Sequence, residues 1–291
     1  MRRIEDVVSN KIEVESLSSW AFILGQEPSR GARSPTLWNA VYTHFGLNTR
    51  MVPLDVSAAD LQEAWDLLSN DSRVLGGAIA IPFKQSIASL LVNQLELSAS
   101  LSSSVNCVFR DPTGLFRGAN TDGEAALAVI KENCSEYMNA QYLVLGCGGA
   151  GSAVISSLAQ VLGPRQVTVS SRSPSAMAWL DALGVKNIPF DSFEHYLETT
   201  DVLINTTSLG FNRASQSPVS LTGLRKLRAE SFVFDVVYQP SPTKLTQDAL
   251  SLRLRATDGK RMNLLQAVGS FQLVNPSLNA TLFESLMARP E

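Results

Sequence analysis

One lysine stands out as a group that could move a proton. Residues 77–85 read GAIAIPFKQ, a buried-looking strand that ends by presenting Lys84. Two more polar residues occupy similar corners: Asp122 in GANTDG, at the start of a helix, and Asn106 inside the apolar stretch SVNC. A lysine whose pKa falls on burial can donate a proton to a developing alkoxide, and a carboxylate can fix its position. The alternative is a solvated surface ion pair, which by itself means little.

A glycine-rich turn follows the apolar strand of QYLVLGCGGAG. Gly146, Gly148 and Gly151 fit the pattern G-x-G-x-x-G at the start of a helix, and this context matters because the pattern alone is weak. The first glycine allows a tight turn, the second admits a pyrophosphate, and the third lets helix and strand pack closely. Together with Gly149 and Ala150, the turn predicts a dinucleotide site at the helix start. The alternative is a tight turn without a ligand.

The end of the next strand indicates which dinucleotide binds. NAD enzymes carry an acidic residue there to bond the ribose hydroxyls, whereas this strand ends VTVSSRS. Ser171, Arg172 and Ser173 offer two hydroxyls and a guanidinium, which suit a phosphate on the adenosine ribose. We therefore expect the cofactor to be NADP(H). The alternative for Arg172 is a solvated surface arginine.

Short β-rich runs alternate with helical patterns, which is typical of an α/β protein with parallel strands. In the first third, the runs predict strands at 20–25, 49–56, 76–81 and 104–110, and helices at 34–47, 57–69 and 83–95. A helix at 121–134 leads to the glycine turn and its long helix, and later elements are strands at 166–171, 201–206 and 231–236 and helices at 261–274 and 279–288.

These elements predict two α/β domains with a cleft between them. Residues 1–120 form an N-terminal substrate-binding catalytic domain, on which residues 263–291 pack back, and residues 121–262 form a Rossmann-like NADP-binding domain. The sequence does not decide between a monomer and a homodimer, and it does not say what the first ~15 residues do.

Composition excludes several classes of partner. The 291 residues carry 24 Lys and Arg against 27 Asp and Glu, so we expect no nucleic-acid partner. No apolar run is long enough to span a membrane, and the N-terminus does not resemble a signal peptide, so we expect a cytoplasmic protein. The three cysteines have no metal-type spacing, and we expect no metal site.

A series of motifs in chain order resembles the shikimate dehydrogenase family and spans nearly the whole length. These motifs are GARSPTLWNAVYTHFGL, IPFK, SVNC, GANTDG, GCGGAG, SRS, INTTSLGF, DVVYQPSPTKL and DGKRMNLLQA. The resemblance implies reversible hydride transfer between NADP(H) and a small cyclic, carboxylate-bearing substrate, in aromatic amino acid biosynthesis or secondary metabolism. It also implies that Lys84 and Asp122 are the catalytic pair, with Lys84 the general acid in reduction and the general base in oxidation.

The resemblance assigns further residues. Asn106 would bond the hydroxyl next to the reacting carbon, and the substrate pocket would be lined by Ser34, Tyr238 and Gln266. Thr206 would lie near the nicotinamide, and the Gly259 carbonyl would lie near its amide.

The chain departs from the family pattern on the substrate side. Where the family usually has two serines separated by one residue, the first position is Ala32, and Asn-Val-Thr before the lysine is replaced by Ala78, Ile79 and Ala80. Three lost hydrogen bonds at ~1 kcal/mol each would weaken shikimate binding by about two orders of magnitude. We therefore expect an active enzyme whose substrate is not shikimate but has a larger or less hydroxylated ring.

Two other interpretations stay open. An ordinary shikimate dehydrogenase, reducing 3-dehydroshikimate to shikimate, would need compensation for the lost contacts, for example from Arg30 or Arg33, which otherwise face water. A non-catalytic NADP-binding sensor would have no use for a proton donor such as Lys84.

Overall fold

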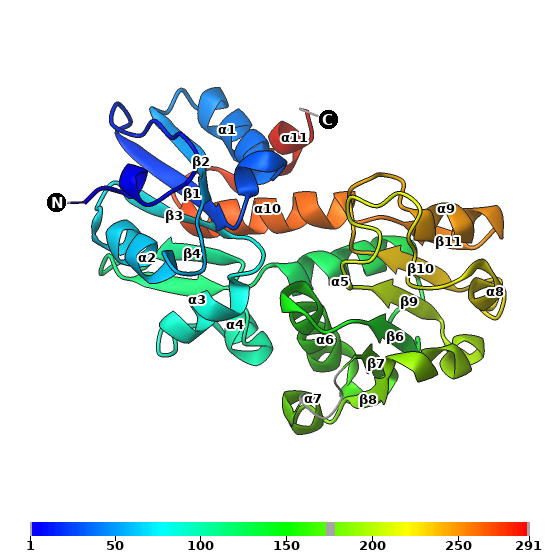
Figure 1. Ribbon diagram of the computed structural model, residues 1–291. Helices are drawn as coiled ribbons and strands as arrows, with labels where there is room; N and C mark the ends of the chain where they lie inside the picture. The colour runs from blue at the N-terminus through cyan, green and yellow to red at the C-terminus, as the bar shows by residue number, and fades with distance from the viewer. Residues whose placement is uncertain (1, 173–177, 290–291) are drawn as a thin grey trace. The chain divides into compact units, whose positions relative to one another are not determined.

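The computed structural model describes residues 2–172 and 178–289, and the chain divides into two compact units. The first unit comprises Met1–Thr121 and Leu264–Glu291, and the second comprises Asp122–Asn263. Each unit is built around its own β-sheet (Figure 1). The predicted α/β class is confirmed.

The first unit contains a five-stranded sheet in the order β2-β1-β3-β4-β5. Its strands are β1 (Ser19–Gly25), β2 (Thr49–Asp55), β3 (Val74–Ile79), β4 (Cys107–Arg110) and β5 (Phe116–Ala119). Its helices are α1 (Ser34–His44), α2 (Leu61–Asn70), α3 (Lys84–Leu90), α4 (Leu97–Ser102), the later part of α10 (Lys260–Val274) and α11 (Phe283–Ala288), with short 3₁₀ turns at Ile4–Asp6, Pro28–Arg30 and Ala280–Leu282.

Helices cover both faces of this sheet (Figure 1). Alternate residues of β1 point to opposite sides, as a strand requires: Trp20 and Phe22 join a core with α2 and α3, whereas Ala21 and Ile23 join a core with α1, α10 and α11. The first unit is therefore a three-layer α/β/α structure in which the carboxyl ends of β1, β2 and β3 share one edge.

The last two strands of this sheet differ from the prediction. The sequence predicts parallel strands, but β4 runs antiparallel to β3, and β5, which was not predicted, runs antiparallel to β4. The predicted helix at 83–95 is also too long. Its end leaves the helix because Gly118 of β5 exchanges backbone hydrogen bonds with Gln94 and Glu96.

The N-terminal segment protects the edge of the sheet. Asn10 accepts from the N–H of Asp55 at 2.8 Å and donates to the carbonyl of Pro53 at 3.0 Å. Asn39 on α1 makes the same two-way contact with Met51, at 2.8 and 3.1 Å. Two side-chain amides therefore satisfy backbone groups of edge strand β2 that an exposed edge would offer to another chain.

The second unit contains a six-stranded parallel sheet in the order β11-β10-β9-β6-β7-β8. Its strands are β6 (Tyr142–Leu145), β7 (Val167–Ser171), β8 (Lys186–Pro189), β9 (Val202–Asn205), β10 (Phe232–Asp235) and β11 (Arg255–Thr257). Its helices are α5 (Asp122–Asn133), α6 (Gly149–Leu162), α7 (Ala178–Ala182), α8 (Leu221–Leu224), α9 (Lys244–Ser251) and the start of α10, with 3₁₀ segments at Pro164–Gln166 and Phe190–Thr199. This is the strand order of a dinucleotide-binding fold, with its switch point between β6 and β9.

Close packing of α5 on α6 completes one face of this sheet. A Cβ on Gly123 would lie 2.5 Å from the carbonyl oxygen of Ala153, so only glycine permits this approach. Strands β8 and β11 were not predicted, because each is only three or four residues long and has a mixed polar sequence. Across residues 2–172 and 178–289, no helix has the length and apolar character needed to cross a membrane.

Candidate functional site

Lys84 lies at the carboxyl edge of the first unit's sheet, where the chain leaves β3. The N–H of Ala80 donates to the carbonyl of Leu24 at 2.7 Å, which ties the end of β3 to the end of β1. After Pro82 the chain begins α3 with Lys84, whose carbonyl accepts from the N–H of Val105 at 2.9 Å. Lys84 is half-buried. Backbone contacts on two sides therefore fix the base of this side chain.

Asn106, which follows Val105 in the chain, lies at the centre of a polar cluster. Its Oδ1 accepts from the N–H of Thr121 at 2.9 Å, and its Nδ2 donates to Thr121 Oγ1 at 3.0 Å. Nδ2 also lies 3.5 Å from Oε1 of Gln266 on α10. Thr121 Oγ1 in turn donates to the Gln266 carbonyl at 3.0 Å and lies 2.9 Å from Ser270 Oγ. The buried amide of Asn106 thus joins the start of β4 to α10.

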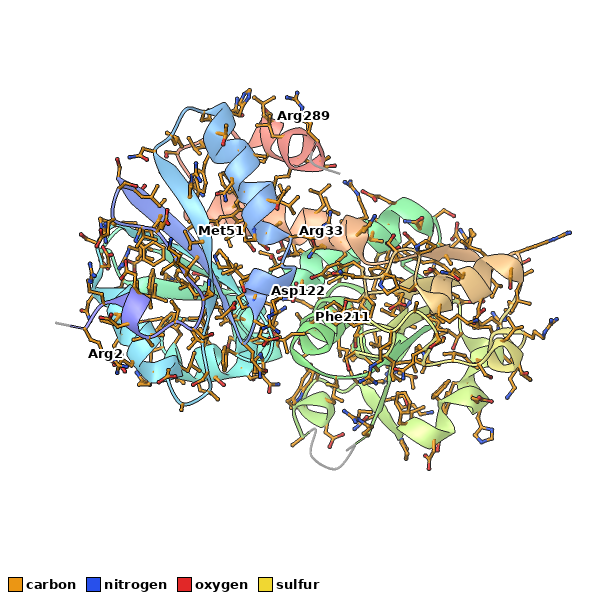
Figure 2. The ribbon with its side chains drawn as sticks, turned by 45° about the horizontal axis from the view of Figure 1, so that its top comes forward. Arg2, Arg33, Met51, Asp122, Phe211 and Arg289 are labelled. Atoms are coloured by element: carbon orange, nitrogen blue, oxygen red, sulfur yellow. The ribbon has the colours of Figure 1, made fainter. Side chains whose placement is uncertain are left out.

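This cluster brings together two predicted substrate residues, Asn106 and Gln266, and two that the sequence reading missed. Thr121 lies in the same GANTDG corner as Asp122, so its position was a usable signal, whereas nothing in the sequence marks Ser270. Asp122 is buried and begins α5 as the first residue of the second unit (Figure 2). The pairing of Lys84 with Asp122 stays a prediction.

The three alanines of the predicted substrate side, Ala32, Ala78 and Ala80, lie in the first unit. Ala78, near the end of β3, is only 7% exposed and belongs to the apolar core that contains Trp38. Ala32 and Ala80 pack against the same core. Ser34, the predicted substrate serine, is buried at the first position of α1.

Arg30 does not stand out as a replacement ligand for a substrate carboxylate. Its side chain is 75% exposed and forms an ion pair with Glu27, with 3.3 Å between Nη1 and Oε1. Arg33 directly precedes α1 and is half-buried.

In the second unit, the three glycines of the predicted turn differ in their surroundings. Gly146 has a φ of +97°, which favours glycine. A Cβ on Gly151 would lie 2.5 Å from Thr206 Oγ1, so this glycine permits close packing of α6 on the turn after β9. Gly148, by contrast, is exposed, and a Cβ there would meet nothing within 4 Å. The open position is therefore the one through which a phosphate would approach the start of α6.

Thr206 is a structural part of this turn. Its Oγ1 lies 3.0 Å from the Leu145 carbonyl and 3.1 Å from the Gly146 carbonyl. It therefore joins the end of β6 to the end of β9, on either side of the switch point. Gly149 and Ala150 form the first turn of α6.

The residues predicted to select NADP follow β7. Arg172 is exposed, as a side chain that binds a ribose phosphate must be. Ser171 is buried, and its hydroxyl donates to Oδ1 of Asn187 at 3.3 Å. Ser173 lies outside the described residues. Arg172 is therefore the group in the described part of β7 and its end that best suits a phosphate.

Two polar residues that the sequence reading missed end neighbouring strands. Asn205 ends β9, Asp235 ends β10, and the Asn205 amide donates to Asp235 Oδ1 at 2.8 Å. Each is a polar residue directly after an apolar run, which is a partial signal in the sequence, but the order of the two strands is not. Burial raises the pKa of the Asp235 carboxyl to about 6, against the effect of its hydrogen bonds.

Two further predicted residues follow strands of this sheet: Tyr238 follows β10 and Gly259 follows β11. The N–H of Gly259 donates to the Val237 carbonyl at 2.9 Å, and a Cβ there would lie 2.0 Å from the Val236 carbonyl oxygen. Tyr238 is half-buried and packs edge-on against Phe211, with 6.1 Å between ring centroids. Only glycine fits at position 259, because the backbone after β10 fills the adjacent space.

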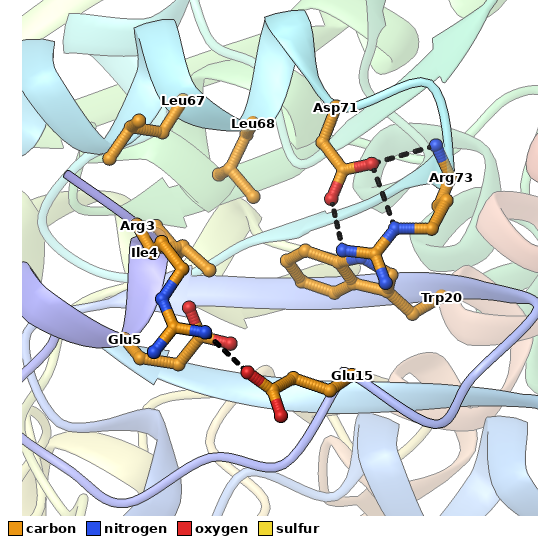
Figure 3. A pocket seen from close by; sticks show the side chains of 9 residues that line it. All are labelled: Arg3, Ile4, Glu5, Glu15, Trp20, Leu67, Leu68, Asp71 and Arg73. Atoms are coloured by element: carbon orange, nitrogen blue, oxygen red, sulfur yellow. Dashed lines mark hydrogen bonds and ion pairs between the residues drawn. The ribbon is translucent and has the colours of Figure 1, made fainter. Parts of the chain in front are cut away.

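A cavity of about 410 Å³ in the first unit is not the predicted site (Figure 3). Its lining includes Trp20 at the start of β1 and none of the predicted site residues. Its arginines already have acidic partners, since Arg73 binds Asp71 through two nitrogens and Arg3 binds Glu15. Within residues 2–172 and 178–289, no group of three His, Cys, Asp or Glu side chains could hold a metal ion.

Comparison with known proteins finds a matching family model and similar proteins. Residues 24–108 match the family model described as the shikimate dehydrogenase substrate binding domain. The NADP(+) shikimate dehydrogenase of Pyrococcus abyssi is 32% identical over 250 residues, which covers 85% of this chain and 89% of that protein.

Solved structures show a similar fold over almost the full length. The shikimate dehydrogenase of Aquifex aeolicus has a TM-score of 0.81 and 25% identity, and the match covers 96% of this chain and 100% of that one. The quinate dehydrogenase of Corynebacterium glutamicum, solved in complex with NAD, has a TM-score of 0.80 and 25% identity, covering 94% and 99% of the two chains.

Proposed function

The chain belongs to the shikimate dehydrogenase family, and from this premise we propose that it acts on a cyclic ketone or alcohol that resembles shikimate but is not shikimate. Its curated relatives are NADP-dependent dehydrogenases, and the chain is an NADP-dependent oxidoreductase of the same kind. In this proposal the first unit binds the substrate and the second binds the cofactor.

The second unit's own residues support the choice of NADP(H), which supplies or accepts a hydride when bound. The amides at the start of α6 would hold the pyrophosphate beside exposed Gly148. Arg172 would hold the ribose phosphate, and no acid stands at the end of β7 to take its place. Family members differ here, since the quinate dehydrogenase was solved with NAD. Equal turnover with NADH, and no loss on Arg172→Ala, would contradict this assignment.

Lys84 supplies the proton in the proposed reaction. Reduction places a hydride on the carbonyl carbon and a proton on its oxygen, and Lys84 Nζ would give that proton. In oxidation the same amine would take it back. Asp122 would hold Lys84 in position and stabilise its protonated form, as a carboxylate partner does.

The substrate proposal depends on one observation above all. Ala32, Ala78 and Ala80 lie in or against the same apolar core, so the three replacements fall in one region of the first unit. Ala80 lies only four residues before Lys84, and its N–H and carbonyl both make backbone contacts at the turn into α3. A substrate pocket lined by these methyl groups would favour a substrate that presents an apolar group where shikimate presents hydroxyls.

An ordinary shikimate dehydrogenase is the second candidate, because Ser34, Asn106, Tyr238 and Gln266 are all retained. A panel of cyclic keto acids and hydroxy acids, followed through the absorbance of NADPH, separates the two. We expect turnover of a less hydroxylated ring to exceed that of shikimate. A clear preference for shikimate and 3-dehydroshikimate would contradict the proposal, and no turnover of any compound would favour a sensor.

A further inference from the structure

Asp235 is a buried carboxylate at the cofactor edge of the second unit. It ends β10 and pairs in register with Asn205, which ends β9, and the two residues are 1% and 0% exposed. In folds with this strand order, a dinucleotide crosses the carboxyl edge of the sheet at the switch point, with one half on each side. Because Arg172 follows β7 on one side, the β9–β10 side is left for the nicotinamide half.

Within the described part of the chain, the groups that hydrogen-bond to this carboxylate are neutral. Oδ1 accepts from Asn205 Nδ2 at 2.8 Å and from the N–H of Val237 at 3.1 Å, and Oδ2 accepts from Thr243 Oγ1 at 2.7 Å. Neutral donors hold the carboxylate without cancelling its charge, in contrast to an arginine or lysine partner. The negative charge is therefore available to act on whatever binds at this edge.

The same hydrogen bonds connect Asp235 to the loops of the cofactor edge. Through Asn205, whose Oδ1 accepts from the N–H of Thr207 at 2.9 Å, Asp235 reaches the turn after β9. Through Val237, whose carbonyl accepts from Gly259 at 2.9 Å, it reaches the turn before α10. Hydrogen bonds therefore link the Asp235 carboxylate to two loops that flank the edge, the turn after β9 and the turn before α10.

We propose that Asp235 tunes the cofactor site electrostatically, favouring the oxidised, positively charged nicotinamide over the neutral reduced ring. The proposal builds on the NADP dependence proposed above. A buried negative charge attracts a nearby cationic ring more strongly than it would in water, because the local dielectric constant is low. Asp235 is a positioning and electrostatic residue here, and no proton transfer is assigned to it.

The charged groups around Asp235 are consistent with this role. Asp258, in the turn before α10, is a like charge that adds to the rise in the pKa of Asp235. Lys244, in the first turn of α9 beside Thr243, forms an ion pair with Asp248 of the same helix. With a pKa of about 6, Asp235 is ionised at pH 8 and largely protonated at pH 5.

The test compares the dissociation constants of NADP⁺ and NADPH, measured by direct binding without substrate. Asp235→Asn keeps the shape of the side chain, and its NH₂ can donate to the Thr243 hydroxyl. We expect it to weaken NADP⁺ relative to NADPH by about fivefold to tenfold. Asp201→Asn is the matched control, because Asp201 lies at the amino end of β9 and its carboxylate accepts from the N–H of Gln141 at 2.9 Å. This control should leave the ratio unchanged.

A second measurement needs no variant. The ratio of the two constants in the wild-type protein should move toward the Asp235→Asn value as the pH falls from 8 to 5.5. The ribose phosphate titrates alike in both cofactor forms, so its effect cancels in the ratio. A pH-independent wild-type ratio, or equal weakening of both forms in Asp235→Asn, would overturn the proposal. If the wild-type protein bound neither form, the NADP dependence itself would be wrong.

Discussion

Nδ2 of Asn106 lies 3.5 Å from Oε1 of Gln266, although 160 positions separate the two residues in the chain. Both were predicted to contact the substrate, one from the start of β4 and the other from α10. The last helices belong to the first unit through the apolar core that Phe271 and Phe283 share with α1, and α10 thereby carries Gln266 to the sheet edge that also carries Lys84.

We expect the effects of Asn106→Ala and Gln266→Ala on kcat/KM to be non-additive. Residues in one hydrogen-bonded cluster typically show coupling energies of ~0.5–3 kcal/mol in a double-mutant cycle. A control cycle pairs Gln266→Ala with Asn70→Ala, since Asn70 lies exposed at the end of α2. Additive effects in both cycles would show that the contact between Asn106 and Gln266 does not contribute to kcat/KM.

The glycine turn offers a sharp contrast between two substitutions. Gly148→Ala should leave the Tm unchanged, because its Cβ meets nothing within 4 Å, yet it should raise the Kd of NADPH by about tenfold, or ~1.4 kcal/mol. Gly151→Ala should lower the Tm, because its Cβ would lie 2.5 Å from Thr206 Oγ1. Thermal unfolding and fluorescence titration measure both. Unchanged NADPH binding in Gly148→Ala would argue against a phosphate at this turn.

Removing the proposed proton donor should affect chemistry more than binding. We expect Lys84→Met to lower kcat by about 10²–10⁴-fold while the Kd of NADPH stays the same. Lys11→Met is a control, because Lys11 is exposed and pairs with Glu13. Retention of most of the turnover by Lys84→Met would remove Lys84 from the mechanism.

The buried carboxyl of Asp235 should make stability depend on pH. Its pKa is about 6 in the folded protein, against an ordinary value near 3.8, so the folded state binds more protons between these values. The contribution of this carboxyl to the stability of the folded protein should therefore fall as the pH rises from about 4 to 6. Relative to wild type, Asp235→Asn should gain ~2–3 kcal/mol between pH 4 and pH 7.

Urea unfolding of both proteins at the two pH values measures this difference. Asp201→Asn again serves as the control, because Asp201 is partly exposed and pairs with Arg228 at 3.0 Å. A stability difference between wild type and Asp235→Asn that did not change with pH would mean that Asp235 titrates near its ordinary pKa.

The sequence predicted the strongly apolar elements of this fold well, and the short elements of mixed polarity poorly. β1 and β6 are continuous apolar runs, α1 has apolar residues at helical spacing, and the structure places these elements and β2 within a few residues of the prediction. β5 was missed because Phe116–Ala119 is short and contains a glycine, and its pairing with residues 94–96 is a long-range contact with no local signal.

The site shows the same division. Gly146, Gly148 and Gly151 were found because their spacing is itself the pattern of a dinucleotide-binding turn. Asn205 and Asp235 were missed because their meaning depends on two strands lying side by side, which strand order decides and local sequence does not. Ser270 joins its cluster only through the packing of α10 on the first unit.

The most direct test of the altered substrate pocket is the kcat/KM for shikimate oxidation with NADP⁺. The wild-type protein is compared with a variant that carries Ala32→Ser, Ala78→Asn and Ala80→Thr. With three hydrogen bonds restored at ~1 kcal/mol each, we expect the variant to use shikimate about a hundredfold better, with the Kd of NADPH unchanged. Efficient shikimate oxidation by the wild-type protein, with no gain in the variant, would contradict an altered substrate pocket.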